Sequence, residues 1–486
     1  MKEVEVGSFP DTKRHFLPVL CNQCKDAPCE RICPTQALHY RPDGIVDLDP
    51  ARCIGCKACM LACPYDQLFI DPNTATAEKC NYCANRLDRG LEPACVVVCP
   101  TQCRIFGDLE DPTIGVSQIR SREMNRARKP EKGTKPGITY VGASDAVIRP
   151  AAAERPLAFQ QTTNAQPRFT PLQYPTEITA REQSFLAAAL SGRATPSTWA
   201  ATIGDLPAQV GYDVHHLKPW GLRIVLYLLA KGIAAGAFFI AAILRLLGSH
   251  DGLVRFGGPA LGMLFTLVTT ALLVADLKRP ERFLYILLKP NWRSWMTRGA
   301  FILVAFGGLA TGALLAELLG LEALARAFLI AGLPAALMTS IYTGFFFAQA
   351  VARDLWQGSH NTLHIAAQST AAGAGALLWL GACAGAAHQQ ALAWVLALGM
   401  LLHVATIVFE VYVHKSPSQD HELALAIVRR FAHRHLMIGC GLFAAVGAAL
   451  FSTSTVALVG MVLLAYVSML LWEHLWVHAG QEVPLS

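Results

Sequence analysis

The sequence predicts a multidomain chain in which a small cysteine-rich α+β domain precedes an all-α bundle of eight transmembrane helices. Three observations lead to this fold class. Thirteen of the fifteen cysteines lie between Cys21 and Cys103. Residues 1–150 hold 39 charged side chains, whereas residues 221–486 hold only 27. Charged residues make up 16% of the chain, against roughly 25% in an ordinary soluble protein. We therefore predict a soluble domain at 1–141, a flexible linker at 142–218 and a membrane domain at 219–486.

The cysteine-rich part contains a spacing typical of iron–sulfur ligands. The run from Cys53 to Cys63-Pro64 has the C-x2-C-x2-C-x3-C-P pattern of bacterial ferredoxins, in which the fourth cysteine ligates the other cluster. The run from Cys21 to Cys33-Pro34 repeats it with a two-residue insertion. We expect a ferredoxin-like domain with two [4Fe-4S] clusters. One would be held by Cys21, Cys24, Cys29 and Cys63, and the other by Cys53, Cys56, Cys59 and Cys33.

A third set of cysteines follows the two runs. Cys80 and Cys83 form a C-x2-C pair, and Cys95 and Cys99-Pro100 repeat the C-x3-C-P ending. This set could close a third cluster by itself, or be half of a pair whose other half lies upstream. Zinc is the weaker alternative, because zinc ribbons do not require the repeated C-x3-C-P ending. A disulfide framework is weaker still, since no secretion signal is visible. We expect Cys103 to be a buried structural thiol.

The first 141 residues resemble the iron–sulfur subunits of molybdopterin oxidoreductases, such as those of dimethyl sulfoxide, polysulfide and tetrathionate reductases. The resemblance includes Cys53-Ile-Gly-Cys56, Cys63-Pro64-Tyr65, Pro93-Ala94-Cys95-Val96 and Phe106-Gly107-Asp108-Leu109. Those subunits carry four cysteine motifs, and the first of them is absent here. In the family, the set from Cys80 to Cys99 shares its clusters with that first motif. The resemblance implies a separate molybdopterin catalytic subunit as partner.

Eight apolar stretches beyond Trp220 are long enough to span a bilayer, which requires about 20 residues. They lie near 222–247, 256–276, 299–320, 325–351, 363–386, 391–413, 435–452 and 455–479. The connections on the side of the N-terminus hold eleven Lys and Arg residues, and the opposite connections hold three. We expect a multi-pass protein of the bacterial inner membrane, and the positive-inside rule places its iron–sulfur domain in the cytoplasm.

Ionisable and hydroxyl residues inside the spans are candidates for function, because burying them in a membrane is costly. They are Tyr227, Lys231, Asp276, Tyr342, His364, His403 and Glu410. A purely structural interpretation makes Lys231 and Asp276 an interhelical ion pair and Tyr342 a hydrogen-bonding residue. The functional interpretation is a quinone site, where a hydroxyl or imidazole binds the quinone oxygen and a carboxylate relays protons. We favour the structural interpretation for His403.

Spans one to four resemble the membrane anchor of polysulfide reductase and its nitrite-reductase-associated (NrfD) relatives. The matching segments are Lys231–Gly236, Asp276–Phe283, Ser294-Trp295, Tyr342-Thr-Gly344 and Arg353–Trp356. The resemblance implies that Tyr342 binds quinone, that Tyr227 stands where the anchor has a histidine, and that Asp276 moves protons. Lys231 and His364 complete the candidate site. The resembling anchors carry no haem, and we expect none here.

These features predict an electron-transfer and anchor subunit rather than a complete enzyme. It would pass electrons between membrane quinone and the separate catalytic subunit through the clusters. A hydrogenase- or formate-dehydrogenase-linked anchor is the alternative of the same class. A membrane transporter or sensor with a structural metal-binding domain is the alternative of another class. The basic residues lie beside apolar segments, so we expect no nucleic-acid partner.

Overall fold

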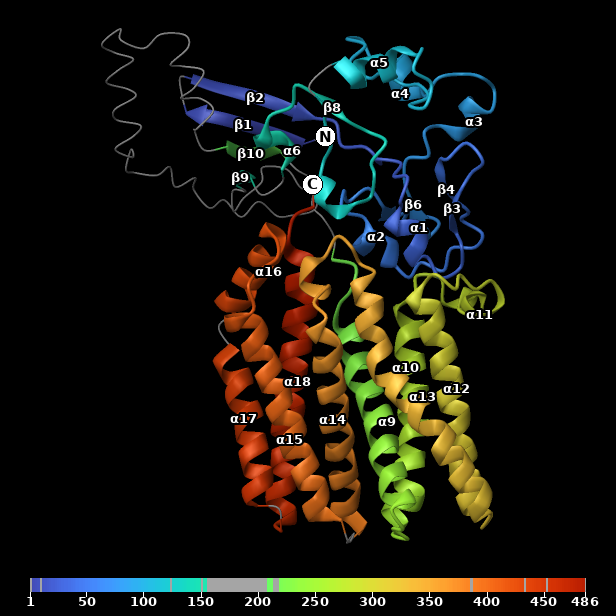
Figure 1. The fold of residues 1–486 in the computed structure, drawn as a ribbon, viewed down its shortest axis with the longest axis vertical. Coiled ribbons are helices and arrows are strands. Elements are labelled where there is room, and N and C mark those ends of the chain that lie inside the picture. Colours follow the sequence, from blue (N-terminus) through green and yellow to red (C-terminus); the bar gives the residue numbers. More distant parts are fainter. Residues whose placement is uncertain are drawn as a thin grey trace, which may run out of the picture. The chain divides into compact units, whose positions relative to one another are not determined.

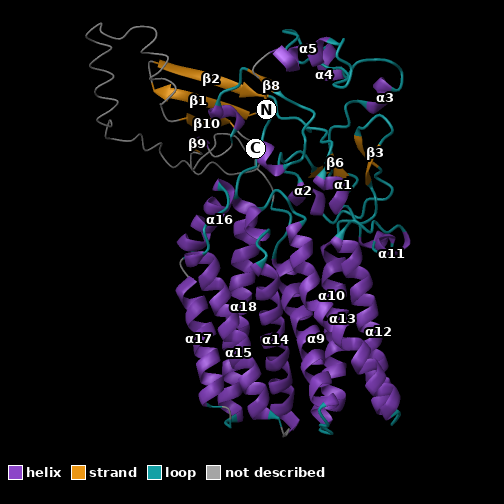
Figure 2. Cartoon of the chain, viewed as in Figure 1, coloured by secondary structure: helices purple, strands orange, loops and turns teal. Residues whose placement is uncertain are grey.

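The computed structural model describes residues 2–8, 11–122, 125–149, 152–154, 208–212, 218–384, 388–431, 434–451 and 453–485. These residues divide into two compact units. Unit 1 contains residues 1–23, 85–217 and 484–486, and unit 2 contains residues 24–84 and 218–483. Figures 1 and 2 show the elements of both units. Compactness therefore groups residues 24–84, which include most of the predicted cluster ligands, with the helical bundle.

Unit 1 is built on a four-stranded sheet of order β2-β1-β10-β9. Its strands are β1 (Lys2–Ser8), β2 (Asp11–Leu17), β9 (Ala153–Glu154) and β10 (Ala208–Tyr212). β1 is antiparallel to both β2 and β10, and β10 is parallel to β9. Val4 and Val6 alternate toward a small core that includes Ala153, as expected for a strand with one buried face.

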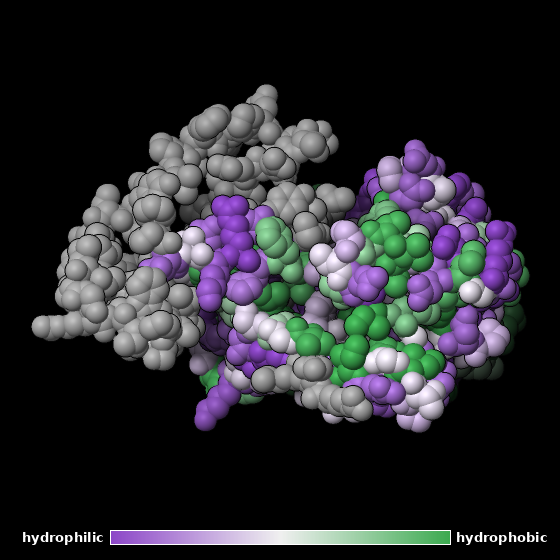
Figure 3. Space-filling model, turned by 90° about the horizontal axis from the view of Figure 1, so that it is seen from above, coloured by the Kyte–Doolittle hydropathy of each residue, from purple (hydrophilic) through white to green (hydrophobic). Residues whose placement is uncertain are grey.

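The remaining elements of unit 1 are short. They are α3 (Ala84–Leu87), which begins at the boundary with unit 2, α4 (Ala94–Val97), α5 (Gly115–Arg122), β7 (Asn125–Arg126), the 3-10 turn η1 (Pro130–Lys132), β8 (Tyr140–Val141) and α6 (Asp145–Ile148). Several large hydrophobic side chains of this unit are exposed, among them Val97, Val98 and Ile105. Figure 3 shows hydrophobic residues gathered among hydrophilic ones on one face of the molecule.

Part of the predicted linker is structured. The described residues between 142 and 218 include α6, β9 and β10, which its composition did not predict. The sequence pattern also predicts a short helix at residues 180–191 of the linker, which lie outside the described residues. Strand β10 joins the sheet because its backbone pairs with β1, with Val4 opposite Val210.

The first part of unit 2 is a repeated helix-and-hairpin motif. Helix α1 (Pro28–Ile32) is followed by the hairpin β3 (Leu38–Tyr40) and β4 (Val46–Leu48). Helix α2 (Ala58–Ala62) is followed by the hairpin β5 (Phe69–Ile70) and β6 (Ala77–Glu78). Each helix ends at the fourth cysteine of its run, Cys33 or Cys63. Each of these two cysteines is followed directly by a proline, which cannot continue a helix. The alternating pattern of residues 44–49 predicts a short strand, and β4 lies within it.

The second part of unit 2 is a bundle of long helices. They are α9 (Leu222–Leu246), α10 (Gly258–Asp276), α12 (Trp295–Leu318), α13 (Glu322–Ala348), α14 (His360–Ala384), α15 (Gln389–Val408), α17 (Arg434–Leu450) and α18 (Thr455–Glu482). Shorter elements join them: η3 (Leu253–Gly257), η4 (Pro280–Arg282), α11 (Tyr285–Leu288), η5 (Asp354–Trp356), η6 (Phe409–Val413) and α16 (Gln419–Arg430).

Six helical segments in the described residues are long and apolar enough to cross a membrane, and the bent pair of α16 and α17 makes a seventh. The sequence predicted eight spans, and α14, which covers the fifth, is not among these candidates. Its centre is rich in alanine and glycine rather than in larger apolar residues. The chain is therefore a multi-pass membrane protein, and by length and composition its described residues offer six candidate spans, or seven if the bent pair counts as one.

Helices α9 and α14 approach each other closely because both carry glycines where they cross. A Cβ atom at Gly236 would lie 1.9 Å from the Ser369 carbonyl oxygen, and one at Gly373 would lie 2.1 Å from the Gly236 carbonyl carbon. Gly232 and Gly236 form the small-xxx-small pattern that brings helix backbones together in membranes. The crossing explains the glycines of the Lys231–Gly236 segment.

Candidate functional site

The predicted ligands Cys33, Cys53, Cys56 and Cys59 surround one cavity. The cavity is also lined by Pro34, Thr35, Ala37, Leu38, Leu48, Ile54, Gly55, Lys57 and Ala77. The backbone N–H of Ala77 donates a hydrogen bond to Cys53 Sγ over 3.4 Å. Convergence of three cysteines of one run with the fourth of the other is the arrangement that the spacing predicted.

The chemistry of these four thiols fits a metal centre. Burial raises the pKa of the Cys56 thiol to about 12, and the nearby Cys33 and Cys53 sulfurs oppose its ionisation further. Burial likewise raises the pKa values of Cys33 and Cys59. Thiolates are the form that binds metal, so a cationic group is needed to stabilise four of them together. A [4Fe-4S] cluster supplies that charge and takes four cysteine ligands.

The other predicted ligands fall into two groups. Cys21, Cys24, Cys29 and Cys63 are all buried, as ligands of an enclosed cluster should be. Within unit 2, the charge of Cys29 acts on Cys59, so the two predicted ligand sets are neighbours there. In contrast, Cys80 is exposed, and Cys83, Cys95 and Cys99 are partly exposed.

Cys103 corrects one expectation, because it is exposed rather than buried. Its Sγ lies 3.4 Å from Cys99 Sγ. Hydrogen bonds to Cys99 from Thr101, Arg104 and Cys103 lower the pKa of the Cys99 thiol to about 6. The third set therefore contains one thiol that ionises easily in an open environment.

The segments of unit 2 that carry the predicted cluster ligands are hydrogen-bonded to the connection between α10 and α12. Lys57 Nζ lies 2.7 Å from Asp276 Oδ2, and both side chains are largely buried. Asn291 Nδ2 donates to the Cys33 carbonyl oxygen (2.8 Å), and Ser294 Oγ donates to that of Ile32 (2.7 Å). The cluster cavity is thus attached directly to the ends of membrane helices.

Arginines of the same connection add further contacts. Arg282 donates to the carbonyl oxygens of Pro50 and Cys53, and Arg279 donates to that of Thr74. Gly55 allows the close approach, because its φ is +67° and a Cβ there would lie 2.6 Å from Lys278 Cβ. Basic residues that the sequence pattern marked only as topology signals therefore also bind the cluster-bearing segment.

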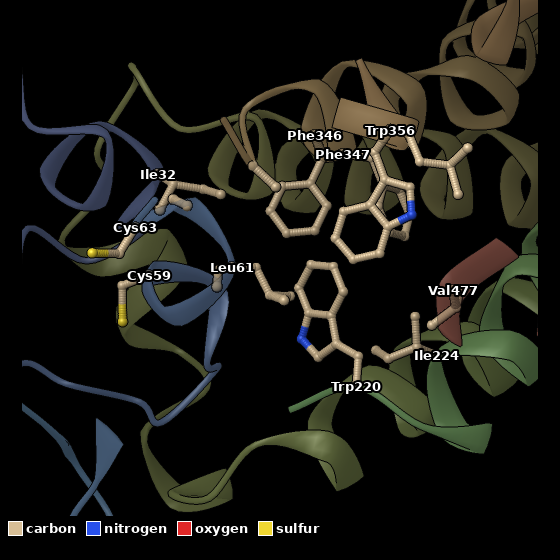
Figure 4. Close-up of a cluster of buried hydrophobic side chains, with 14 of the residues drawn as sticks. Ile32, Cys59, Leu61, Cys63, Trp220, Ile224, Phe346, Phe347, Trp356 and Val477 are labelled. Carbon is tan, nitrogen blue, oxygen red and sulfur yellow. The ribbon is translucent and has the colours of Figure 1, made fainter. Parts of the chain in front are cut away.

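Aromatic side chains fill the space between α2 and the helices. The Trp220 ring lies 5.5 Å from that of Phe346, 5.4 Å from that of Phe347 and 5.8 Å from that of Trp356. Leu61 of α2 points toward these rings, whereas the sulfurs of Cys59 and Cys63 point away from them (Figure 4). Trp220 Nε1 also donates to the Cys56 carbonyl oxygen over 3.4 Å. Sequence reasoning did not identify Trp220 as part of the site.

Three of the predicted quinone residues lie together in the bundle. Lys231 of α9 donates to the Ser340 carbonyl oxygen (2.8 Å) and to Thr343 Oγ1 (2.5 Å) of α13. Its Nζ also lies 5.1 Å from the centre of the Tyr342 ring. Tyr227 lies one turn before Lys231 and is within electrostatic range of Tyr342. Gly299 of α12 leaves room for Tyr342, because a Cβ there would lie 2.2 Å from the ring.

The other two predicted residues make different contacts. Asp276 pairs with Lys57, so the Lys231–Asp276 ion pair of the structural interpretation is not formed. The charged group that acts on Lys231 is Glu473 of α18, which sequence reasoning missed although it is an acidic residue inside an apolar stretch. His364 Nδ1 lies 2.7 Å from Thr406 Oγ1, and its ring centre lies 4.8 Å from that of His403. The structure thus brings together two histidines from facing helices.

The similarities to known proteins separate the cysteine-rich part of the chain from the helical part. Residues 12–109 match the 4Fe-4S dicluster domain family, and residues 213–483 match the family described as polysulphide reductase, NrfD. A dicluster ferredoxin-type domain is therefore joined to a helical membrane domain. The second match covers more than half of the chain. This protein therefore belongs to the polysulphide reductase NrfD family.

Curated relatives resemble the N-terminal part. A tetrathionate reductase subunit of Salmonella typhimurium is 46% identical over 137 residues, which are 28% of this chain and 55% of the relative. The arsenate respiratory reductase iron-sulfur subunit ArrB of Shewanella sp. is 35% identical over 183 residues, covering 28% of this chain and 78% of the relative. A polysulfide reductase component of Wolinella succinogenes is 43% identical over 122 residues, covering 25% and 64%. The chain thus spans little more than half of the tetrathionate reductase relative.

Proposed function

We propose that this chain is the electron-transfer and membrane-anchor subunit of a molybdopterin oxidoreductase complex. Electrons would pass between membrane quinone and a separate catalytic subunit through [4Fe-4S] clusters. The observation that carries the proposal is the attachment of the Cys33, Cys53, Cys56 and Cys59 cavity to the ends of the membrane helices. A cubane there, when bound, accepts and donates single electrons. The protein residues fix its position against the bundle.

The quinone site is proposed around Tyr342, with Tyr227 and Lys231 beside it. Quinone chemistry needs groups that donate and accept protons at the quinone oxygens, and the Tyr342 hydroxyl is the candidate. Phe346 follows Tyr342 by one helical turn and packs on Trp220, whose indole donates to Cys56. This chain of contacts supports electron transfer between Tyr342 and the cluster cavity.

Asp276 and His364 receive more specific proposals. Because Asp276 pairs with Lys57, we assign it to docking of the cluster-bearing segment, where it can still influence protons at the end of α10. His364 contacts Thr406 and His403. It would act in proton movement within the later helices rather than beside Tyr342.

The partner and the topology are proposed on similar grounds. The names of the relatives describe components of tetrathionate, arsenate and polysulfide reductases, which supports a catalytic subunit as partner. The exposed Val97 at the end of α4 and Val98 directly after it, next to Cys95 and Cys99, suit such an interface. We propose eight spans, with α14 as the fifth because it packs closely on α9. The basic connections support a cytoplasmic iron–sulfur domain in a bacterial inner membrane.

The test replaces Tyr342 by phenylalanine in the full chain. A quinol analogue is mixed anaerobically with the oxidised protein, and cluster reduction is followed by the loss of visible absorbance. Tyr342→Phe should slow this reduction by about 100-fold, the lower range for removal of an acid–base group, with iron content unchanged. Tyr466→Phe is the matched control, since its hydroxyl donates to the Ala372 carbonyl oxygen elsewhere in the bundle. Equal rates in both variants would contradict the proposal.

A further inference from the structure

Three histidines from separate segments converge on one buried glutamate. Glu410 lies in η6, a single turn of π-helix at the end of α15. His421 Nε2 of α16 lies 3.0 Å from Glu410 Oε1. His414 Nδ1, just after η6, lies 4.0 Å from Glu410 Oε2, and His360 Nε2 at the start of α14 contacts the same oxygen. One ligand atom each from Glu410, His414 and His421 lie within 4.8 Å of one another.

The donor atoms of this cluster are buried and incompletely satisfied. The side chains of Glu410 and His421 are each only 2% exposed. His360 Nε2, His414 Nδ1 and Glu410 Oε2 are shielded from solvent and have no partner with hydrogen-bond geometry. A buried polar atom without a partner costs about 1–3 kcal/mol. Three such donor atoms that contact one another without hydrogen-bond geometry would be better satisfied by a cation that they share.

The charges around Glu410 lead to the same conclusion. Among the described residues, the ion-pair partners of Glu410 are histidines only, with no Lys or Arg. A buried carboxylate needs a compensating positive charge. Neutral imidazoles leave their ring nitrogens free to bind a cation, which would supply that charge.

Surrounding contacts hold the histidine rings in position. His421 Nδ1 lies 3.1 Å from Ser416 Oγ, which leaves Nε2 directed at Glu410. Ser418 Oγ accepts the backbone N–H of His421 and thereby caps α16. Outer contacts of this kind orient metal-binding histidines. Single turns of π-helix such as η6 are frequent at functional sites.

We propose that His360, Glu410, His414 and His421 bind a zinc ion. Imidazole nitrogens and a carboxylate are ligands that zinc accepts, and four protein ligands match its tetrahedral preference in structural sites. The donor set lacks the thiolates that favour Cu(I) and the all-oxygen shell that favours Mg²⁺ or Ca²⁺. The ion would tie the start of α14, the end of α15 and α16 together. This inference is independent of the quinone proposal.

The test measures zinc and iron together in the full chain, purified anaerobically in detergent without chelator and then incubated with zinc sulfate and desalted. We expect about one zinc per chain. Glu410→Gln and His414→Ala should each lower zinc retention by about tenfold or more, with iron unchanged. The His414 side chain is less buried than that of Glu410, so replacing His414 is less liable to disturb folding. His474→Ala is the control, because His474 lies beside His478 on α18, outside the cluster.

X-ray absorption at the zinc edge distinguishes the proposed site from the cysteine sites. Nitrogen and oxygen neighbours at about 2.0–2.2 Å support it, whereas sulfur neighbours at about 2.3 Å would place the zinc on cysteines and overturn it. Failure of iron-replete protein to retain zinc would also overturn it, leaving a hydrogen-bonded histidine–glutamate cluster. Zinc retention equal in the Glu410, His414 and His474 variants would do the same.

Discussion

The ion pair between Lys57 and Asp276 should control how firmly the cluster-bearing segment stays attached to the membrane helices. Its atoms are 2.7 Å apart, and the side chains are 8% and 13% exposed. Removing one partner of a fully buried pair costs about 3–5 kcal/mol, whereas exposed pairs contribute about 0.2–1 kcal/mol. For this mostly buried pair we expect about 2–3 kcal/mol. Since 1.4 kcal/mol is a tenfold change, Asp276→Asn should favour local opening by roughly 30–150-fold.

The assay is amide hydrogen exchange of the full chain in lipid nanodiscs, with its clusters in the reduced state. Exchange is measured on peptides that cover Gly55–Ala62. Asp276→Asn and Lys57→Met should each lose protection there by the stated factor. Asn291, Ser294 and Arg282 still hold the segment, so iron content should not fall. Lys289→Met is the control, because Lys289 is an exposed basic residue of the same connection that contacts only the Tyr285 ring in the described contacts.

A double variant tests whether the two side chains act through each other. Combining Lys57→Met with Asp276→Asn removes both charges, so no unpaired charge stays buried. The double variant should therefore be less damaged than the two single effects added together. Protection within twofold of the parent in Asp276→Asn, or strictly additive losses in the double variant, would refute the reasoning.

Three other changes have defined outcomes. Gly299→Ala places a methyl group 2.2 Å from the Tyr342 ring and should cost about 1–3 kcal/mol by overpacking. It should also slow cluster reduction by quinol, whereas Gly308→Ala on the same helix, where a Cβ meets nothing within 4 Å, should leave both stability and rate unchanged. Replacing Cys80, Cys83, Cys95 and Cys99 together by serine should leave about eight irons per chain, those of two cubanes. A lower iron count in this variant would show that the buried sets do not assemble alone. In cluster-free protein, Cys99 has a pKa of about 6, below the usual value, so its thiolate form and its alkylation rate should persist down to about that pH and fall below it. Cys103→Ser should shift this midpoint upward, and a wild-type midpoint near 9 would contradict the hydrogen-bond assignment.

Features that depend on short stretches of sequence were predicted well. The C-x2-C-x2-C-x3-C-P spacing predicted that Cys33 joins Cys53, Cys56 and Cys59, and these four residues line one cavity. Hydropathy located α9 at 222–247, and the helix runs from Leu222 to Leu246. Both signals arise from local chemistry. Closely spaced cysteines can bind one cluster, and an apolar segment must have a certain length to span a bilayer.

Pairings between distant segments could not be predicted in the same way. Lys57 and Asp276 are 219 residues apart, and the sequence pattern offered only Lys231 as a partner for Asp276. Nothing in a single sequence states that Lys231 finds backbone and hydroxyl acceptors on α13 instead. The histidine cluster had a partial signal, since Glu410 and His414 are four residues apart. Its other members, His360 and His421, lie in segments whose proximity depends on the packing of α14, α15 and α16.

The basic connection between α10 and α12 has two functions that support each other. Under the topology proposed above, its Lys and Arg residues would set membrane orientation through the charge bias of the loops. Arg279 and Arg282 also donate hydrogen bonds to carbonyl oxygens beside the cluster cavity. Those carbonyl oxygens can be satisfied by this connection only when the cluster-bearing segment folds on the same side of the membrane. If these charges orient the bundle as proposed, they also select the face on which residues 24–84 dock, so insertion in the opposite orientation would separate the predicted cluster ligands from the surface that binds them.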